Sequence, residues 1–207
     1  GYNVFAPLHD FEKVTSQGIN GAIFALLAFN AQNYNPSVAQ LNRVASLTDV
    51  AATTVTTREK LVDYIVEKEL ANGGFALSGT QADPDITAMA LQALAPYKAD
   101  ADVQPVINRA LTKLSAMQLE NAGYISAGAE NVQSAAQVLI ALSALEIDAA
   151  TDERFIKNGN TILDNIGSFA IGDGGYKHPK NGSYNLLATQ QATQAYIAYD
   201  RFLKGLP

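Results

Sequence analysis

Apolar residues recur with a helical period along most of the chain. In residues 58–70 and 106–117 they fall on one face of a helix, and residues 155–166 repeat this pattern more weakly. After each of these amphipathic segments and a loop comes a stretch that is apolar on nearly every side. A helix that is apolar all round must be buried. We therefore expect polar-faced outer helices to alternate with buried inner helices.

A glycine followed by an aromatic residue marks the loop of each repeat. The pairs are Gly74-Phe75, Gly123-Tyr124 and Gly175-Tyr176, with 49 and 52 residues between their glycines. Ala-rich stretches follow at 87–94, 134–142 and 190–199, and a fourth at 19–29 has no such pair before it. The chain thus contains four weak repeats of unequal quality. We expect the three aromatic residues to plug the gaps between adjacent helical hairpins.

The composition supports close helix packing. The chain has 207 residues, of which 34 are Ala, 15 are Gly and 7 are Pro, and small side chains let inner helices approach one another. Signals for β-strands are sparse, although residues 53–57 look extended. We expect an all-α fold, a ring or arc of about four helical hairpins in a single domain over residues 1–207. Predicted helix caps are Asp83 before Pro84, Asp102, and Thr151 or Asp152.

Charge and cysteine content exclude several classes of function. The net charge is −6 and no Lys/Arg cluster occurs, so we expect no nucleic-acid partner. The absence of Cys removes thiol catalysis and thiolate metal sites, and we expect no metal site. The longest apolar run, residues 22–29, is far short of a membrane span, and the start lacks a signal peptide. The abrupt ends suggest a piece excised from a longer protein.

One segment carries a family resemblance. Gly-Gly-Phe75, followed by Asp83-Pro-Asp-Ile-Thr-Ala-Met-Ala-Leu-Gln-Ala-Leu94, resembles the prenyltransferase/squalene-oxidase repeat. This repeat occurs in terpenoid cyclases, protein prenyltransferase β-subunits and transcobalamin/intrinsic-factor proteins, and the resemblance covers roughly residues 15–200. It implies an α/α toroid, which four hairpins would leave incomplete. It is closest to non-catalytic bacterial surface proteins related to transcobalamin, which implies an extracellular or cell-surface location and makes a corrinoid one candidate ligand.

Asp85 is the candidate for catalysis. Class II terpene cyclases use a similar Asp-x-Asp-Asp-Thr-Ala segment with its middle Asp as proton donor, but here Ile86 replaces the next Asp. A carboxylate in the first helical turn is also stabilised in its charged form, whereas a proton donor needs a raised pKa. Carbocations need aromatic walls, and the chain has no Trp. We favour Asp83 as a cap and Asp85 as an ordinary first-turn carboxylate.

Polar residues recur on the inner helices. Alignment on Ala28, Ala93, Ala141 and Ala198 places four polar residues in register, namely Asn20, Asp85, Gln133 and Gln190. Gln137 lies four residues after Gln133, and Gln194 lies four residues after Gln190, so each pair shares one helical face. These amides either bond to loops and neighbouring helices, or hold a polar ligand at the mouth of the toroid; Thr87 fits both alternatives.

The sequence therefore predicts a non-enzymatic binding or structural module of a secreted or surface protein. Its partner would be a small molecule, a glycan or a protein. Tyr184, in the glycine-rich loop 171–184, is a further candidate for ligand contact. The full set of candidate ligand-binding residues is Asp85, Thr87, Gln133, Gln137, Gln190, Gln194 and Tyr184. The alternative is a terpenoid cyclase or prenyltransferase-like enzyme that acts on an isoprenoid with Asp85 as general acid.

Overall fold

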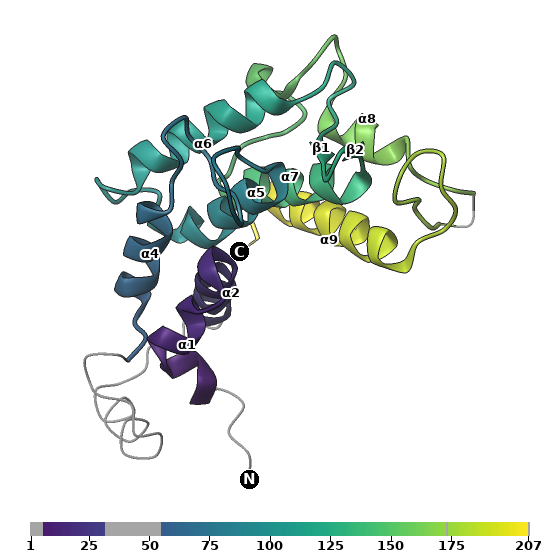
Figure 1. Cartoon of the computed structure of the whole chain (residues 1–207). Coiled ribbons are helices and arrows are strands. Elements are labelled where there is room, and N and C mark those ends of the chain that lie inside the picture. Colours follow the sequence, from purple (N-terminus) through teal and green to yellow (C-terminus); the bar gives the residue numbers. More distant parts are fainter. Residues whose placement is uncertain (1–5, 32–54, 173, 207) are drawn as a thin grey trace. The chain divides into compact units, whose positions relative to one another are not determined.

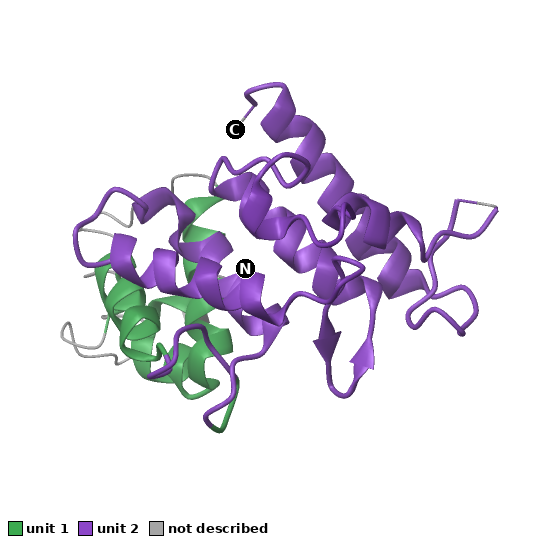
Figure 2. Cartoon of the chain, turned by 90° about the horizontal axis from the view of Figure 1, so that it is seen from above, with its two compact units in different colours: residues 1–69, 77–79 green, residues 70–76, 80–207 purple. Residues whose placement is uncertain are grey.

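The computed structural model describes residues 6–31, 55–172 and 174–206, and this part of the chain is largely helical (Figure 1). Contacts between residues divide the chain into two compact units (Figure 2). Unit 1 comprises residues 1–69 and 77–79, and unit 2 comprises residues 70–76 and 80–207. The expectation of a mostly α-helical fold is confirmed.

Unit 1 is a small helical cluster. A 3₁₀ turn, η1 (Ala6–His9), precedes α1 (Phe11–Thr15), α2 (Gly18–Asn30) and α4 (Arg58–Glu67). The predicted apolar face of α4 is buried and α4 packs on α2, as α1 does. Of the run predicted to be extended, Val55 forms an isolated antiparallel bridge with Asp10, whereas residues 53 and 54 lie outside the described part.

Unit 2 contains the remaining elements. Its α-helices are α5 (Pro84–Leu94), α6 (Gln104–Met117), α7 (Val132–Ala144), α8 (Ile162–Gly167) and α9 (Leu186–Leu203). Its short elements are the 3₁₀ turns η3 (Ala95–Tyr97) and η4 (Glu153–Phe155) and the antiparallel strands β1 (Ile125–Ser126) and β2 (Ala129–Glu130). Helix α7 packs against both α5 and α9, while α6 packs on α5 and α8 packs on α7.

The core of unit 2 repeats along its Ala-rich helices. In α5, α7 and α9 the third, seventh and tenth residues are all buried. In that order they are Ile86, Ala90 and Ala93; Ser134, Val138 and Ala141; and Ala188, Ala192 and Ala195. The tenth residue is Ala in every case and fully buried, which lets neighbouring helix backbones come close. Burial of α5 and α7 is as predicted, but α9 also exposes large apolar residues such as Leu186 and Ile197.

The loops with the glycine–aromatic pairs have the same hydrogen bonds in all three repeats. The N–H of Gly73 donates to the carbonyl of Leu70 (2.8 Å), and the N–H of Leu70 donates to the carbonyl of Gly74 (3.0 Å). The same two bonds recur within 119–123 and 171–175. The residue two positions before each loop aromatic has a positive φ, which is 81° at Gly73, 61° at Ala122 and 85° at Gly174. The internal repeat is therefore a repeat of backbone conformation as well as of sequence.

Two local predictions were wrong, and one hairpin was not predicted. The outer helix expected over 155–166 is replaced by η4, a turn and the short α8, because Asn158 and Gly159 have positive φ. Asp102 is not the cap of α6; Val103 occupies that position without a side-chain hydrogen bond. The β1–β2 hairpin was not predicted, and its turn also depends on positive φ, at residues 127 and 128. Asp83 caps α5 as expected, and Asp152 caps η4.

Candidate functional site

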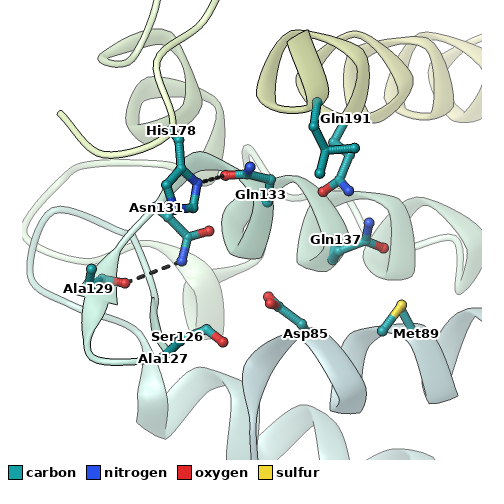
Figure 3. Close-up of a pocket in the computed structure, with 11 residues that line it drawn as sticks. Asp85, Met89, Ser126, Ala127, Ala129, Asn131, Gln133, Gln137, His178 and Gln191 are labelled. Carbon is teal, nitrogen blue, oxygen red and sulfur yellow. Dashed lines mark hydrogen bonds between the residues drawn. The ribbon is translucent and has the colours of Figure 1, made fainter. Parts of the chain in front are cut away.

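A pocket of about 330 Å³ lies where α5, α7 and α9 begin (Figure 3). Its lining takes two residues from each helix, one turn apart. These are Asp85 and Met89 of α5, Gln133 and Gln137 of α7, and Leu187 and Gln191 of α9. The hairpin side and a loop complete the lining with Ser126, Ala127, Ala129, Asn131 and His178.

The three helices contribute equivalent positions because they begin in the same way. Each has an Asp or Asn at its N-cap, whose side chain accepts a hydrogen bond from a backbone N–H of the first turn. The N-caps are Asp83, Asn131 and Asn185. The N–H of each N-cap residue also donates to the carbonyl of the preceding loop aromatic, at 2.9, 3.4 and 2.9 Å. Counted from these caps, the lining residues are the second and sixth of each helix.

The carboxyl group of Asp85 points into this pocket (Figure 3). Its Oδ1 is buried and has no hydrogen-bond partner within the described part of the chain. Burial raises the pKa of this carboxyl above its usual range, and the nearby charge of Asp83 acts in the same direction. Ser134, Ser126 and His178 oppose the rise without cancelling it.

The expectation that the helix terminus would keep Asp85 in its charged form at an ordinary first turn is therefore corrected. Desolvation outweighs the helix dipole here, because the hairpin and α7 cover the start of α5. Asp83 has the role that was predicted for it. Its Oδ1 accepts from the N–H groups of Asp85 (2.9 Å) and Ile86 (3.1 Å), and its Oδ2 accepts from the hydroxyl of Ser126 (2.8 Å).

Two of the pocket glutamines are oriented by neighbours. Nε2 of Gln92 donates to both the backbone carbonyl (3.1 Å) and Oε1 (2.9 Å) of Gln137. Nε2 of Gln137 makes no hydrogen bond to any described residue. Gln133 Oε1 lies 2.7 Å from Nδ1 of His178, which donates to it in this arrangement. No side-chain hydrogen bond of Gln191 occurs within the described residues.

The other candidate residues on α9 lie elsewhere. Gln190 and Gln194 are exposed and do not line the pocket, where Gln191 lies instead. Tyr184 is 53% exposed and is not in the lining; its ring lies close to Gly175. Asn20 is on α2 in unit 1, and its Oδ1 is buried without a hydrogen-bond partner in the ranges described.

Thr87 has a structural position. Its hydroxyl accepts from the N–H of Phe75 (2.9 Å) and donates to the carbonyl of Phe75 (3.2 Å), so it holds the first glycine–aromatic loop on α5. Thr189 repeats half of this arrangement, since its hydroxyl accepts from the N–H of Tyr176 (2.9 Å). Phe75 and Tyr124 are fully buried and Tyr176 is half-buried, which agrees with packing roles for the first two.

A second polar network supports the hairpin side of the pocket. Oε1 of Glu130 accepts from Nδ2 of Asn121 and of Asn165, each at 2.9 Å, and forms an ion pair with Lys180 at 3.1 Å. Burial alone would raise the pKa of Glu130, but these three contacts lower it below the usual range. Because Lys180 and His178 share one loop, the network fixes that loop beside the hairpin.

The lining is mostly neutral and combines polar side chains with apolar ones such as Met89 and Leu187. It contains one carboxyl and one imidazole besides amides and a hydroxyl, and within the described residues no Lys, Arg, Phe or Tyr lines it. In the same residues, no three His, Cys, Asp or Glu side chains are grouped so that they could hold a metal ion. None of the described helices is both long and apolar enough for a membrane span.

Comparison with models of protein families gives no match, and neither does comparison with curated proteins.

Proposed function

We propose that the chain is a non-enzymatic ligand-binding module built from α/α-toroid-type repeats, and that the pocket formed by α5, α7 and α9 is its binding site. One observation carries the proposal. The second and sixth residues of three equivalent helices meet in one pocket, and four of these six are Asp or Gln. These four residues lie on helices and outside the fully buried core, so neither a loop position nor a core position explains why they are polar.

The alternative for these amides is mutual hydrogen bonding within the fold. Only the Gln92–Gln137 contact joins two glutamines in the described structure. The buried Oδ1 of Asp85 has no such partner there. An unsatisfied buried polar group costs roughly 1–3 kcal/mol. Retention of this group in a pocket is therefore better explained by a ligand that supplies its partner.

The packing order within unit 2 supports an incomplete toroid. In toroids of the family that the sequence resembles, inner helices pack on one another and outer helices lie behind them. Here α5, α7 and α9 pack in sequence, with α6 on α5 and α8 on α7. A stack of this kind would place the pocket at the mouth of the arc, where all three inner helices begin.

Location and ligand size follow from separate considerations. The resemblance to bacterial surface proteins supports an exported or cell-surface module.

Small-molecule pockets span about 300–1,000 Å³, and this one has about 330 Å³. We therefore expect a ligand much smaller than a corrinoid.

The raised pKa of Asp85 favours a second candidate, an isoprenoid-processing enzyme with Asp85 as general acid. The described lining offers no Phe or Tyr ring to a carbocation, which is why we place this candidate second. Incubation with a prenyl diphosphate or a squalene-like substrate separates the two. Turnover that is abolished in Asp85→Asn would establish the enzyme and overturn the binding module.

The test of the binding module is a screen of thermal stability against glycans, short peptides, corrinoids and other small metabolites. A ligand present at 100 times its Kd stabilises the native state by about 2.7 kcal/mol, which gives a clear rise in Tm. We expect at least one rise that is lost in Gln137→Ala and Gln191→Ala but kept in Gln190→Ala, whose side chain is exposed on the same helix. A rise that persists in the pocket variants would contradict the assigned site.

A further inference from the structure

We infer that the pocket takes a neutral sugar ring, either a hexose or an N-acetylhexosamine, and contacts it through Asp85, Gln137 and Gln191. This inference rests on the proposed function, because it names the ligand class of the same site. It follows from the hydrogen-bonding groups that the lining leaves unused, from the lining's charge and from its apolar part.

The first argument concerns donors and acceptors. Gln92 donates two hydrogen bonds to Gln137, one of them to the backbone carbonyl, and this fixes Oε1 of Gln137 as an acceptor. Nε2 of Gln137 is consequently a donor that makes no hydrogen bond to a described residue and is open to an acceptor of the ligand. Oδ1 of Asp85 is a buried acceptor that lacks a donor in the described structure. Hydroxyl groups satisfy both, because each donates one hydrogen bond and accepts others.

The second argument concerns charge. An anionic ligand would face the carboxyl of Asp85, and the described lining offers no Lys or Arg to balance it. An ammonium group would suit Asp85 alone, because Gln137 presents the hydrogens of Nε2 to the pocket. A neutral ligand rich in hydroxyls meets neither penalty.

The third argument concerns shape and the apolar part of the lining. Met89 is the sixth residue of α5 and Leu187 the second of α9, so each lies on the lining beside a polar residue of its own helix. Their side chains give the C–H face of a sugar ring an apolar surface. A pocket of about 330 Å³ has room for a small ligand of this size.

The test follows side-chain amide signals of Gln137 and Gln191 by NMR at pH 7 during titration with single sugars. The probes are the methyl glycosides of glucose, galactose, mannose, N-acetylglucosamine and N-acetylgalactosamine, together with the free sugars. Each probe that binds is then compared with its uronic acid and with its 2-amino counterpart. We expect saturable shifts for at least one neutral sugar, with its acidic and amino counterparts bound at least tenfold more weakly.

Two variants locate the contacts. Gln137→Ala and Asp85→Ala should each weaken binding by about tenfold, the size expected for the loss of one good hydrogen bond, while Gln190→Ala should leave it unchanged. Backbone spectra that match the wild type away from the pocket show that each variant is folded. Binding of a methyl glycoside identifies a terminal sugar of a glycan as the source, and binding of free sugars alone identifies a monosaccharide.

Two outcomes would overturn the inference. One is tighter binding of an amino or acidic counterpart than of its neutral parent, and the other is the lack of any shift with all neutral sugars. The thermal screen separates this failure from that of the binding module. If a peptide or other ligand raises Tm and loses its effect in Gln137→Ala, the module stands and the sugar assignment falls. If nothing raises Tm, both fall.

Discussion

Gln92 and Gln137 are joined by a two-armed contact in which a single amide nitrogen of Gln92 donates to the backbone carbonyl and to the side-chain oxygen of Gln137. The contact links α5 to α7 one turn beyond the pocket residues of α5 and orients a side chain that lines the pocket. Gln92 therefore contributes to helix packing and also orients a pocket residue, although it does not itself line the pocket.

Gln92→Met keeps the length of this side chain and removes both hydrogen bonds. We expect the free energy of unfolding to fall by about 1 kcal/mol, the usual net contribution of such bonds, and ligand binding to weaken because the Gln137 amide is free to rotate. Urea denaturation and the NMR titration measure the two effects. Gln190→Met, an exposed position on α9, is the control. Equal loss of stability in both variants would contradict the role of the contact.

Thr87→Val tests the attachment of the first glycine–aromatic loop. Valine has nearly the same shape but cannot accept from the N–H of Phe75, which would be left buried and unpaired. We expect a loss of roughly 1–3 kcal/mol in the free energy of unfolding, the cost of such a group. The matched control is Thr193→Val, because Thr193 is exposed on α9 and should change stability by no more than about 0.5 kcal/mol. An effect of control size at Thr87 would argue against the clamp.

Gly21→Ala tests packing in unit 1. A Cβ at Gly21 would overlap the backbone carbonyl oxygen of Val14, which cannot move as a flexible side chain could. We expect destabilisation by roughly 1–3 kcal/mol, typical of overpacking. Gly167→Ala is the contrasting helical position, since its added Cβ comes only within 3.7 Å of the Tyr196 hydroxyl. A lower Tm for Gly167→Ala than for Gly21→Ala in thermal denaturation would contradict the packing described for α1 and α2.

Asp85 should give the stability of the protein a recognisable dependence on pH. Because burial raises its pKa in the folded state, the native protein holds this proton more tightly than the unfolded chain does. Stability from this group is thus present at low pH and is lost as pH rises from the usual range of aspartate through the raised value. Asp85→Asn should raise Tm at pH 7 and approach the wild type in acid.

Asp85→Ala, which removes both side-chain oxygens, should weaken ligand binding, so the two variants separate stability from function. Asp200→Asn, which changes an exposed carboxylate on α9, is the control for net charge. A Tm for Asp85→Asn below that of the wild type at pH 7 would show that the ionised carboxylate stabilises the fold. That result would remove the argument that a ligand supplies the hydrogen-bond partner that Asp85 lacks.

The sequence predicted the repeats correctly because their signals are local. A glycine–aromatic pair requires a particular turn, and an all-apolar helix requires burial, so both can be read from short segments. The same local logic failed at residues 155–166, where an apolar period continues through Asn158 and Gly159. These two residues adopt positive φ and break the helix, and a weak period could not outweigh them.

The register of the last helix shows what pattern matching lacked. Alignment on Ala198 placed Gln190 beside Gln133, although the buried equivalent of Ala141 is Ala195. Counting from the N-caps Asn131 and Asn185 would have placed Leu187 and Gln191 in the pocket instead. The caps fix where each helix starts, whereas alanines recur too often in α9 to define a unique alignment.

The pKa of Asp85 could not be predicted from its helix position. The dipole at the start of α5 is a local property, but the desolvation that overrides it comes from segments some fifty residues away. His178 was likewise missed as a pocket residue, because its loop reaches the site only through tertiary contacts such as that between Gln133 and its ring.

The three helices of the stack use different residues for packing on one another and for lining the pocket. Positions three, seven and ten bury small or apolar side chains, while positions two and six face the pocket. In the proposed binding module, exchange of residues at the latter two positions would therefore alter ligand selection with little effect on helix packing, except at Gln137, whose side chain bonds to Gln92. Six side chains on an otherwise constant frame would suffice to give such a scaffold many different specificities.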